Sequence, residues 1–467
     1  MVDSKLKMEI DDILVDEIKG KISKASSKTQ NKTKSSFLDF PLKIHRINIK
    51  NSNLNIEQKG QQLALNDINL NISELEINLN KANQFLLKSG NYNFNLKSFS
   101  YEPNQYYKIS SNNIKITKKG GQISNFAMVP LLSRAQFIKM IPTQKDLYDV
   151  KAPSISFAGN YDLLNQNKFV NLSNVTLNNV NANIFRSKIP KDDETVKSLY
   201  SKMLRSVKIP LFINNFDIRN SILVYEEDIP TSNGPGEISF KPFNLNLKNI
   251  NSGKMKGKPT QVAITINAGF MGVSPLHVKW GFNTVDLQDK FTISGNVSNM
   301  QASHLNPFIE PYLHVTATGM IKKLEFDFSG NPVEINGNMK MDHDNVKIAI
   351  LKKDTNEKKK FLSTIANLFI KNSSDKFPAS VTVDHVKRDN TRSFFNLLWK
   401  GLENGLGKTL IGINYKENVE TVKNVASDIK DVKSAVKNVT EKLKAKTDPP
   451  KKEEPKKKKG FFERIFH

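Results

Sequence analysis

The chain contains no cysteine among its 467 residues, and this absence excludes disulfide bonds, thiol catalysis and thiolate metal ligands. Tryptophan is scarce, at 2 residues, and no zinc-finger pair or RNA-binding aromatic strand occurs, so nucleic acid is not the expected partner. No run of about 18 or more apolar residues is present, and no signal-peptide core precedes the first predicted helix. The sequence therefore predicts neither a membrane-spanning helix nor an export signal.

Residues 1–22 are predicted to form an amphipathic helix, because their larger apolar residues step by three and four along one stripe. The residues of this stripe are Leu6, Ile10, Ile13, Leu14 and Ile18. The helix would begin almost at Met1 without a lead-in, so we expect the gene product to start further upstream with an apolar anchor. Residues 23–36 are rich in Ser, Thr and Lys and predict a flexible linker.

From about residue 42 to about residue 351, apolar residues recur at every second position in short runs. A β-strand points alternate side chains to opposite faces, so each run predicts a strand with one apolar and one polar face. Roughly fifteen to twenty runs, separated by turns with Asn, Gly, Ser or Pro, are typical of meandering antiparallel strands. Four runs define candidate residues of the apolar face: Phe243, Leu245, Leu247; Val262, Ile264, Ile266; Leu324, Phe326, Phe328; and Val346, Ile348, Ile350.

The predicted fold is mainly β with C-terminal helices, and the β region covers residues 37–357. Short helical interruptions are expected at about residues 131–140 and 196–207. Residues 358–415 predict amphipathic helical segments, with two apolar stripes that start at Phe361 and Phe394. Residues 416–446 predict a heptad-like helix that either pairs with another helix or caps the end of the sheet.

Positive charge is in excess, with 70 basic and 46 acidic residues and a net charge of +24. The expected partner is an anionic lipid surface, and the simpler alternative is a surface that only keeps the protein soluble. Residues 447–467 predict a disordered tail with a cationic run and a terminal aromatic box. The tail residues expected at a membrane surface are Lys456, Lys457, Lys458, Lys459, Phe461, Phe462, Ile465 and Phe466. A docking peptide for a protein partner is the alternative for this tail.

Catalytic motifs are absent from the sequence. The stretch Gly405 to Thr409 reads GLGKT, but it lacks the upstream glycine of a phosphate loop and lies in a predicted helix. Asp342, His343 and Asp344 lack the glycine and the terminal glutamate of a calcium loop and predict a solvated turn. We therefore expect no enzyme activity, no cofactor and no metal.

Two segments resemble the AsmA-like family of Gram-negative envelope proteins. The first combines an aromatic-Arg pair, two aspartates, a Met-Leu-Arg helix end and a strand that closes in Tyr-Glu-Glu. Its matching residues are Phe185, Arg186, Asp192, Asp193, Met203, Leu204, Arg205, Tyr225, Glu226 and Glu227. The second segment, residues 291–351, is similar to the C-terminal core of that family. Its matching residues are Leu305, Asn306, Pro307, Thr318, Gly319, Phe328, Ser329, Gly330, Gly337 and Met339.

This resemblance implies a taco-shaped β-groove, attachment to the inner membrane with the bulk in the periplasm, and a role in phospholipid transport or outer-membrane biogenesis. The resemblance implies no catalytic residues for this chain. Lipid carriage also agrees with the pattern itself, since burying a sixteen-carbon chain is worth about 12 kcal/mol at about 0.8 kcal/mol per CH₂. Two alternatives remain: a closed β core without ligand, and an envelope scaffold that binds protein partners through the C-terminal helix.

Overall fold

The computed structural model describes nineteen strands, four α-helices and one short 3₁₀-helix. The prediction of a mainly β fold, built as an antiparallel meander with short helical interruptions and a C-terminal helix, is confirmed. The described residues are 7–24, 42–58, 60–79, 85–88, 90–163, 165, 167–230, 232, 234–313, 315–350 and 380–410.

The chain divides into two compact units. Unit 1 comprises Met1–Asp193, Ser198–Glu227 and Ile238–Ile293, and unit 2 comprises Glu194–Lys197, Asp228–Glu237 and Ser294–His467. Unit 1 contains β1 to β15 almost entirely and the start of β16, together with helices α1 and α2. Unit 2 contains most of β16 and the elements that follow it.

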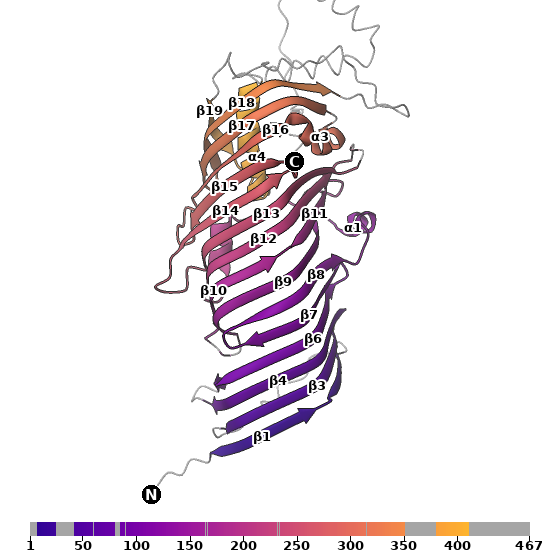
Figure 1. The fold of residues 1–467 in the computed structure, drawn as a ribbon, viewed down its shortest axis with the longest axis vertical. Coiled ribbons are helices and arrows are strands. Elements are labelled where there is room, and N and C mark those ends of the chain that lie inside the picture. Colours follow the sequence, from indigo (N-terminus) through magenta and orange to yellow (C-terminus); the bar gives the residue numbers. More distant parts are fainter. Residues whose placement is uncertain are drawn as a thin grey trace, which may run out of the picture. The chain divides into compact units, whose positions relative to one another are not determined.

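Most strands of unit 1 follow one another in chain order (Figure 1), but β1 and β2 both pair with β3, β5 and β6 both pair with β4, and β10 and β11 both pair with β9. Their bounds are β1 Met8–Asp16, β2 Lys19–Lys24, β3 Leu42–Gln58, β4 Gln61–Leu79, β5 Phe85–Lys88, β6 Asn91–Asn104, β7 Tyr107–Thr117, β8 Gly120–Pro130, β9 Asp146–Asp162, β10 Phe169–Asn178, β11 Asn181–Ser187, β12 Leu211–Asp228, β13 Gly236–Asn251, β14 Gln261–Phe270 and β15 Ser274–Asn283. Antiparallel pairing runs through β3, β4, β6, β7, β8, β9 and β10, and again through β13, β14 and β15. Strand β12 instead runs parallel to β10.

The N-terminal residues form strands, so the helix predicted for residues 1–22 is wrong. Strands β1 and β2 pair in parallel with β3, and Ser23 and Lys24 belong to β2 rather than to a linker. Ile10 and Ile13 suggest a helix because they lie three residues apart. In the structure they pair with Ile44 and Ile47, which also lie three residues apart in β3. In β4, which pairs with β3, the matching step from Ile72 to Leu75 contains Glu74 with a φ of 54°, and such an irregularity displaces the two-residue period and imitates the spacing of a helix.

Similar irregularities recur along the sheet. Non-glycine residues with positive φ interrupt several strands, and most are asparagine or aspartate, which tolerate this conformation best. Two of them, Asn51 and Asp67, are bonded across β3 and β4: Asn69 accepts from the Asn51 N–H at 3.3 Å, and Asn53 accepts from the Asp67 N–H at 3.0 Å. These side-chain amides satisfy backbone groups that the ladder leaves unpaired. The interruptions thereby keep the apolar residues on one face.

Two short helices interrupt unit 1, as the sequence predicts. Helix α1 spans Arg134–Met140 and α2 spans Tyr200–Ser206. Ser133 and Gln136 form a capping box at the start of α1, and Phe137 buries its ring at the edge of the sheet. The residues around Phe137 in this small core are Ile141, Leu147 and Phe185, with Tyr106 and Tyr107 packed against them.

Unit 2 combines strands with a covering helix. Its elements are β16 Phe291–Gln301, the 3₁₀-helix η1 Ala302–Leu305, α3 Asn306–Leu313, β17 Val315–Gly330, β18 Glu334–Ile350, β19 Ser380–Lys387 and α4 Phe394–Leu410. Strand β18 pairs antiparallel with both β17 and β19. Helix α4 confirms the helical stripe that begins at Phe394, whereas the helical prediction fails at β19.

Several predictions lie outside the described residues. They concern most of the linker at 25–36, the stripe that begins at Phe361, the heptad-like helix at 416–446 and the tail at 447–467 with its lysines and aromatic box. These remain predictions.

Candidate functional site

A continuous apolar face crosses unit 1. Residues that lie directly opposite each other on paired strands share a face, so the pairing register traces rows of side chains across the sheet. One row crosses nine strands from β1 to β12 and consists of Val15, Ile49, Leu70, Phe94, Ile116, Gly121, Phe157, Val175 and Phe216. We call this the long apolar row. A second row, from β2 to β11, consists of Ile22, Ile56, Leu63, Tyr101, Ile109, Met128, Val150 and Ala182.

Most side chains of the long apolar row remain partly accessible, although Val175 is buried. Ile49, Leu70, Phe94 and Phe157 are half-buried, although they lie in the middle of long strands. The glycine in the row makes room for an aromatic ring, because a Cβ at Gly121 would lie 2.7 Å from the Phe157 ring. An apolar row of this length with partly accessible side chains is a candidate binding surface.

The predicted residues of β13 and β14 belong to one face as well. Leu245 pairs with Ile266 and Leu247 with Ile264, while Phe243 lies opposite Ala268. Phe243, Leu245, Leu247 and Ile266 are half-buried, like the long apolar row.

Val262 and Ile264 are more enclosed, with Val262 only 1 % exposed. Ile264 pairs with Trp280, and Tyr200 of α2 packs edge-on against that indole at 5.1 Å between ring centroids. Helix α2 therefore covers this end of the face.

The predicted residues of β17 and β18 lie in a closed core instead. Leu324 and Phe326 pair with Met341 and Met339, and Phe328 is 1 % exposed. On β18, Val346 is buried and Ile348 is half-buried, while the backbone of Ile350 pairs with Val315.

Helix α4 seals this part of unit 2 through its glycines. A Cβ at Gly401 would lie 3.4 Å from the Phe328 ring and 3.3 Å from Ile335, so the helix approaches the strands closely. The side chains of β17 alternate between the two faces as expected, because Lys323, Glu325 and Asp327 face water. Lys323 and Glu325 form an ion pair at 2.7 Å. The alternation is therefore the same as in unit 1, but the apolar face is covered.

The opposite face of unit 1 carries polar ladders. Asn215 donates to Asn174 at 3.0 Å, and Asn246 donates to Asn215 at 2.7 Å, which ties β10, β12 and β13 together. Asp217 accepts from both Asn215 and Asn246, and Arg219 adds an ion pair at 2.8 Å. Burial disfavours the Asp217 carboxylate, but these hydrogen bonds outweigh it and hold its pKa below the ordinary value. The two faces of the sheet thus differ sharply in chemistry.

The first segment that resembles the AsmA-like family attaches α1 to the sheet. Arg134 of α1 donates to Glu226 at 2.9 Å, and its guanidinium lies 4.4 Å from the centre of the Phe185 ring. Asn183 also donates to Glu226, at 2.6 Å. Burial alone would raise the pKa of Glu226, but the bonds from Arg134 and Asn183 outweigh it and lower this pKa. These residues have a structural role at the strand ends.

Further residues of that segment form ion pairs beside the same edge. Arg186 contacts Asp146 at 3.0 Å, and Lys188 contacts Glu227 at 2.6 Å with both side chains nearly buried. Tyr225 donates to the same Glu227 carboxylate, and burial together with this charge raises the pKa of Tyr225 well above its ordinary value. The motif therefore stabilises the fold.

The helix end of the segment is also held by charge. Arg205 of α2 contacts Asp289 at 2.6 Å and donates to the carbonyl oxygens of Thr284 and Asp286. Asp192 accepts from Gln144 at 2.7 Å. Met203, by contrast, is exposed.

In the second segment that resembles the AsmA-like family, residues 291–351, an asparagine links a helix to a strand and glycines occupy positions that leave no room for a side chain. The Asn306 side chain donates to Thr316 and accepts from the N–H of Ala317, both at 2.8 Å, and so links α3 to β17. Gly319 has a φ of 95°, and a Cβ at Gly337 would lie 2.1 Å from the Asp327 carbonyl oxygen. These positions are also structural.

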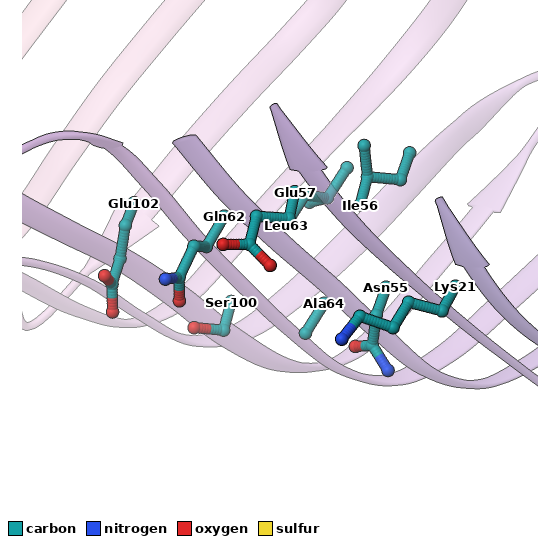
Figure 2. A pocket seen from close by; sticks show the side chains of 9 residues that line it. All are labelled: Lys21, Asn55, Ile56, Glu57, Gln62, Leu63, Ala64, Ser100 and Glu102. Atoms are coloured by element: carbon teal, nitrogen blue, oxygen red, sulfur yellow. The ribbon is translucent and has the colours of Figure 1, made fainter. Parts of the chain in front are cut away.

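A shallow hollow of about 300 Å³ lies on the polar side near the N-terminal strands (Figure 2). Ala64 and Ser100 are small and form its floor, while Lys21, Glu57 and Glu102 stand around it. The hollow has mixed charge and most of its lining residues are polar, so it does not match the chemistry of the apolar face.

Two other sequence expectations concern possible sites. His343 lies in β18 opposite Ile321 and is buried, so the prediction of a solvated turn at residues 342–344 is wrong. Among the described residues, no group of three or more acidic or histidine side chains could hold a metal. Gly405 to Thr409 form the last turns of α4, as the helical reading of GLGKT predicts.

Comparison of the chain with protein-family models and with curated proteins finds no match. Within the part of the chain that the structure describes, no helix is both long and apolar enough to cross a bilayer.

Proposed function

We propose that unit 1 binds the acyl chains of phospholipid on its half-exposed apolar face and serves lipid transport without catalysis. The observation that carries the proposal is the long apolar row, in which nine successive strands present one apolar line to the surface. The described binding surface comprises this row and the predicted residues Phe243, Leu245, Leu247 and Ile266. The closed core around Phe328 is not part of it.

The dimensions of the row suit acyl chains. Strands lie about 4.8 Å apart, so nine strands span about 38 Å before twist shortens the row. One acyl chain covers about half of a 30 Å hydrocarbon core, or about 15 Å, and therefore lies across only three or four strands. Neighbouring positions offer nearly the same apolar surface, so a chain can shift along the row with little change in free energy.

The resemblance to the AsmA-like family supports the same proposal and extends it to location. We place the protein in the cell envelope, associated with the inner membrane and facing the periplasm, in phospholipid transport or outer-membrane biogenesis. The apolar face and the two resembling segments support this assignment. The scaffold alternative depends on residues 429–443, which lie outside the described part of the chain.

A photoreactive residue tests the proposal directly. We expect a photo-crosslinker at Phe94, in the long apolar row, to capture lipid when the full chain is irradiated with phospholipid and analysed by mass spectrometry. The matched control is Asn93, the adjacent exposed residue on the polar face of β6. A second control at Phe326 is expected to capture no lipid, because α4 and the neighbouring strands enclose that region.

Equal capture at Phe94 and Asn93 would refute an apolar binding face, since nonspecific association would then explain the signal. Absence of lipid at Phe94, together with normal folding, would also refute it. Capture at Phe326 as efficient as at Phe94 would instead extend the binding surface into unit 2.

A further inference from the structure

Successive loops of unit 1 meet along one edge of the sheet. The Gly159 N–H donates to the carbonyl oxygen of Lys119 at 2.9 Å, which joins the β7–β8 turn to the end of β9. Three further backbone bonds of 2.9 Å continue the series: Val170 to Pro210, Ser252 to Leu211, and Thr284 to Thr260. A Cβ at Gly253 would lie 3.2 Å from Val285, so the last two loops touch. These loops form a continuous line of strand ends.

Exposed lysines occupy every loop of this edge. The side chains that define the lysine edge are Lys119, Lys168, Lys208, Lys254, Lys256, Lys258 and Lys290. The acidic residues of the last loop are turned toward the protein: Asp289 is nearly buried and pairs with Arg205, and Asp286 accepts from the backbone N–H groups of Gln288 and Lys290. The surface of the edge is therefore strongly cationic.

Exposed aliphatic side chains stand among these lysines. Leu287 is 82 % exposed at the tip of the β15–β16 loop, and Val285 beside it is 45 % exposed. Leu163, at the start of the β9–β10 loop, is 51 % exposed. Lysines beside protruding aliphatic residues form the combination that binds a membrane interface, where charge attracts the surface and apolar groups enter it.

The edge that carries α1 has a different character. Three of its basic residues, Arg134, Arg186 and Lys188, are neutralised by Glu226, Asp146 and Glu227, while Lys139, Lys145 and Lys191 near α1 are exposed. Among the described basic side chains, those at the α1 edge are thus more extensively paired with carboxylates than those at the lysine edge. An anionic partner is therefore expected to bind the lysine edge.

We propose that the lysine edge of unit 1 docks on the surface of a bilayer that contains anionic lipid. Docking in this orientation brings the strand ends, and hence the margin of the apolar face, to the level of the headgroups. A lipid chain then reaches the apolar face without crossing a wide layer of water. A nucleic acid would also be attracted by the lysines, but it offers no environment for Leu287 and Leu163.

Vesicle co-sedimentation of the full chain tests this surface. The probe is a vesicle of phosphatidylcholine with phosphatidylglycerol, compared with phosphatidylcholine alone. The edge variant is Lys168→Gln, Lys256→Gln and Lys290→Gln; the matched control is Lys139→Gln, Lys145→Gln and Lys191→Gln, which removes the same charge from exposed lysines near α1. Any contribution of the C-terminal tail is the same in both variants.

We expect the edge variant to bind anionic vesicles about 100-fold more weakly than the natural chain, since each lysine near such a surface contributes about fivefold. The control variant is expected to lose far less. Leu287→Ser should weaken binding on the order of tenfold, with the larger relative effect at high salt, where lysines are screened. Fluorescence of Trp280 reports whether unit 1 remains folded in each variant.

Equal loss in the two lysine variants would overturn the proposal, because net charge alone would then account for binding. Unchanged binding of the edge variant would overturn it as well and assign attachment to another part of the chain. Tighter binding of duplex DNA than of anionic vesicles, abolished by the same lysine changes, would replace the bilayer by nucleic acid. Docking is independent of lipid capture at Phe94, so either result can fail alone.

Discussion

Placing a carboxylate on the apolar face distinguishes an accessible surface from a sealed core. We compare Phe94→Asp in unit 1 with Phe328→Asp in unit 2. Both phenylalanines lie on long strands and follow the same alternation, but Phe94 is half-buried and Phe328 is 1 % exposed beneath α4. The pair therefore isolates the effect of the covering helix.

The expected magnitudes differ widely. Removing a buried Phe side chain costs about 3–5 kcal/mol, and an unpaired buried charge adds several kcal/mol. Phe328→Asp is thus expected to remove most or all of the stability of unit 2, since a typical domain has about 5–15 kcal/mol. Complete burial of a Phe is worth about 1.5–3 kcal/mol, so Phe94→Asp should cost about 1–2 kcal/mol, with its carboxylate still reaching water.

The chain supplies one tryptophan for each unit. Trp280 lies in β15 of unit 1 and Trp399 in α4 of unit 2. Urea unfolding is followed by fluorescence in two backgrounds, Trp399→Phe to observe unit 1 and Trp280→Phe to observe unit 2. The two units are analysed separately because one two-state transition cannot describe both.

We expect Phe328→Asp to abolish the Trp399 transition and Phe94→Asp to shift the Trp280 transition only modestly. Collapse of unit 1 on Phe94→Asp, as severe as that of unit 2 on Phe328→Asp, would show that the face of unit 1 is sealed. Tolerance of Phe328→Asp would refute the packing of α4 on β17 and β18.

Three further predictions concern local contacts. The Glu226 pKa lies below its ordinary value of 4.5, so the carboxylate contributes stability above that pH which is lost as pH falls through the lower folded-state value. Glu226→Gln should therefore flatten this part of the acid-unfolding profile, and an unchanged profile would contradict the role of Arg134. Gly405→Ala gains about 1 kcal/mol of helix propensity, but its Cβ would lie 2.6 Å from the Met339 sulfur and 3.0 Å from the Met339 Cβ. Thermal unfolding should show a net loss of about 1 kcal/mol; a stabilised variant would mean that Met339 moves freely. Asn220 has a φ of 47°, so Asn220→Val should cost about 1–2 kcal/mol in urea unfolding and Asn220→Gly less, whereas equal costs would exclude backbone strain as the cause.

Alternation in the sequence was sufficient to predict which side chains share a face. Leu245 and Ile266 are paired across β13 and β14, and Leu324 and Phe326 are buried while Glu325 between them faces water. This success has a local cause, because the two-residue period of a strand depends only on backbone geometry. The same local rule says nothing about what covers a face.

Covering depends on contacts between distant parts of the chain. Phe328 meets Gly401 of α4, which lies more than seventy residues later in the sequence. The apolar stripe of α4 was visible in the sequence, but no pattern specified the strand on which that stripe would lie. In the sequence, the accessible and the covered regions of the apolar face consequently look alike.

The N-terminal strands show a different failure. A three-residue step such as Ile10 to Ile13 suggests a helix when it is taken alone. The same step separates Ile72 from Leu75 in β4, where Glu74 has a φ of 54°. A three-residue step flanked by two-residue steps, with Asn, Asp or Glu inside it, is therefore the signal of an irregular strand that could have identified β1.

The succession of similar strands in unit 1 has a consequence for how such a chain can change in length. Each strand of the long apolar row is bonded chiefly to its immediate neighbours, as in a repeat protein. Duplication or deletion of one hairpin would lengthen or shorten the row by about 10 Å and leave more distant contacts intact. The length of the apolar row is thus an inherited quantity, adjustable in steps of two strands without redesign of any core.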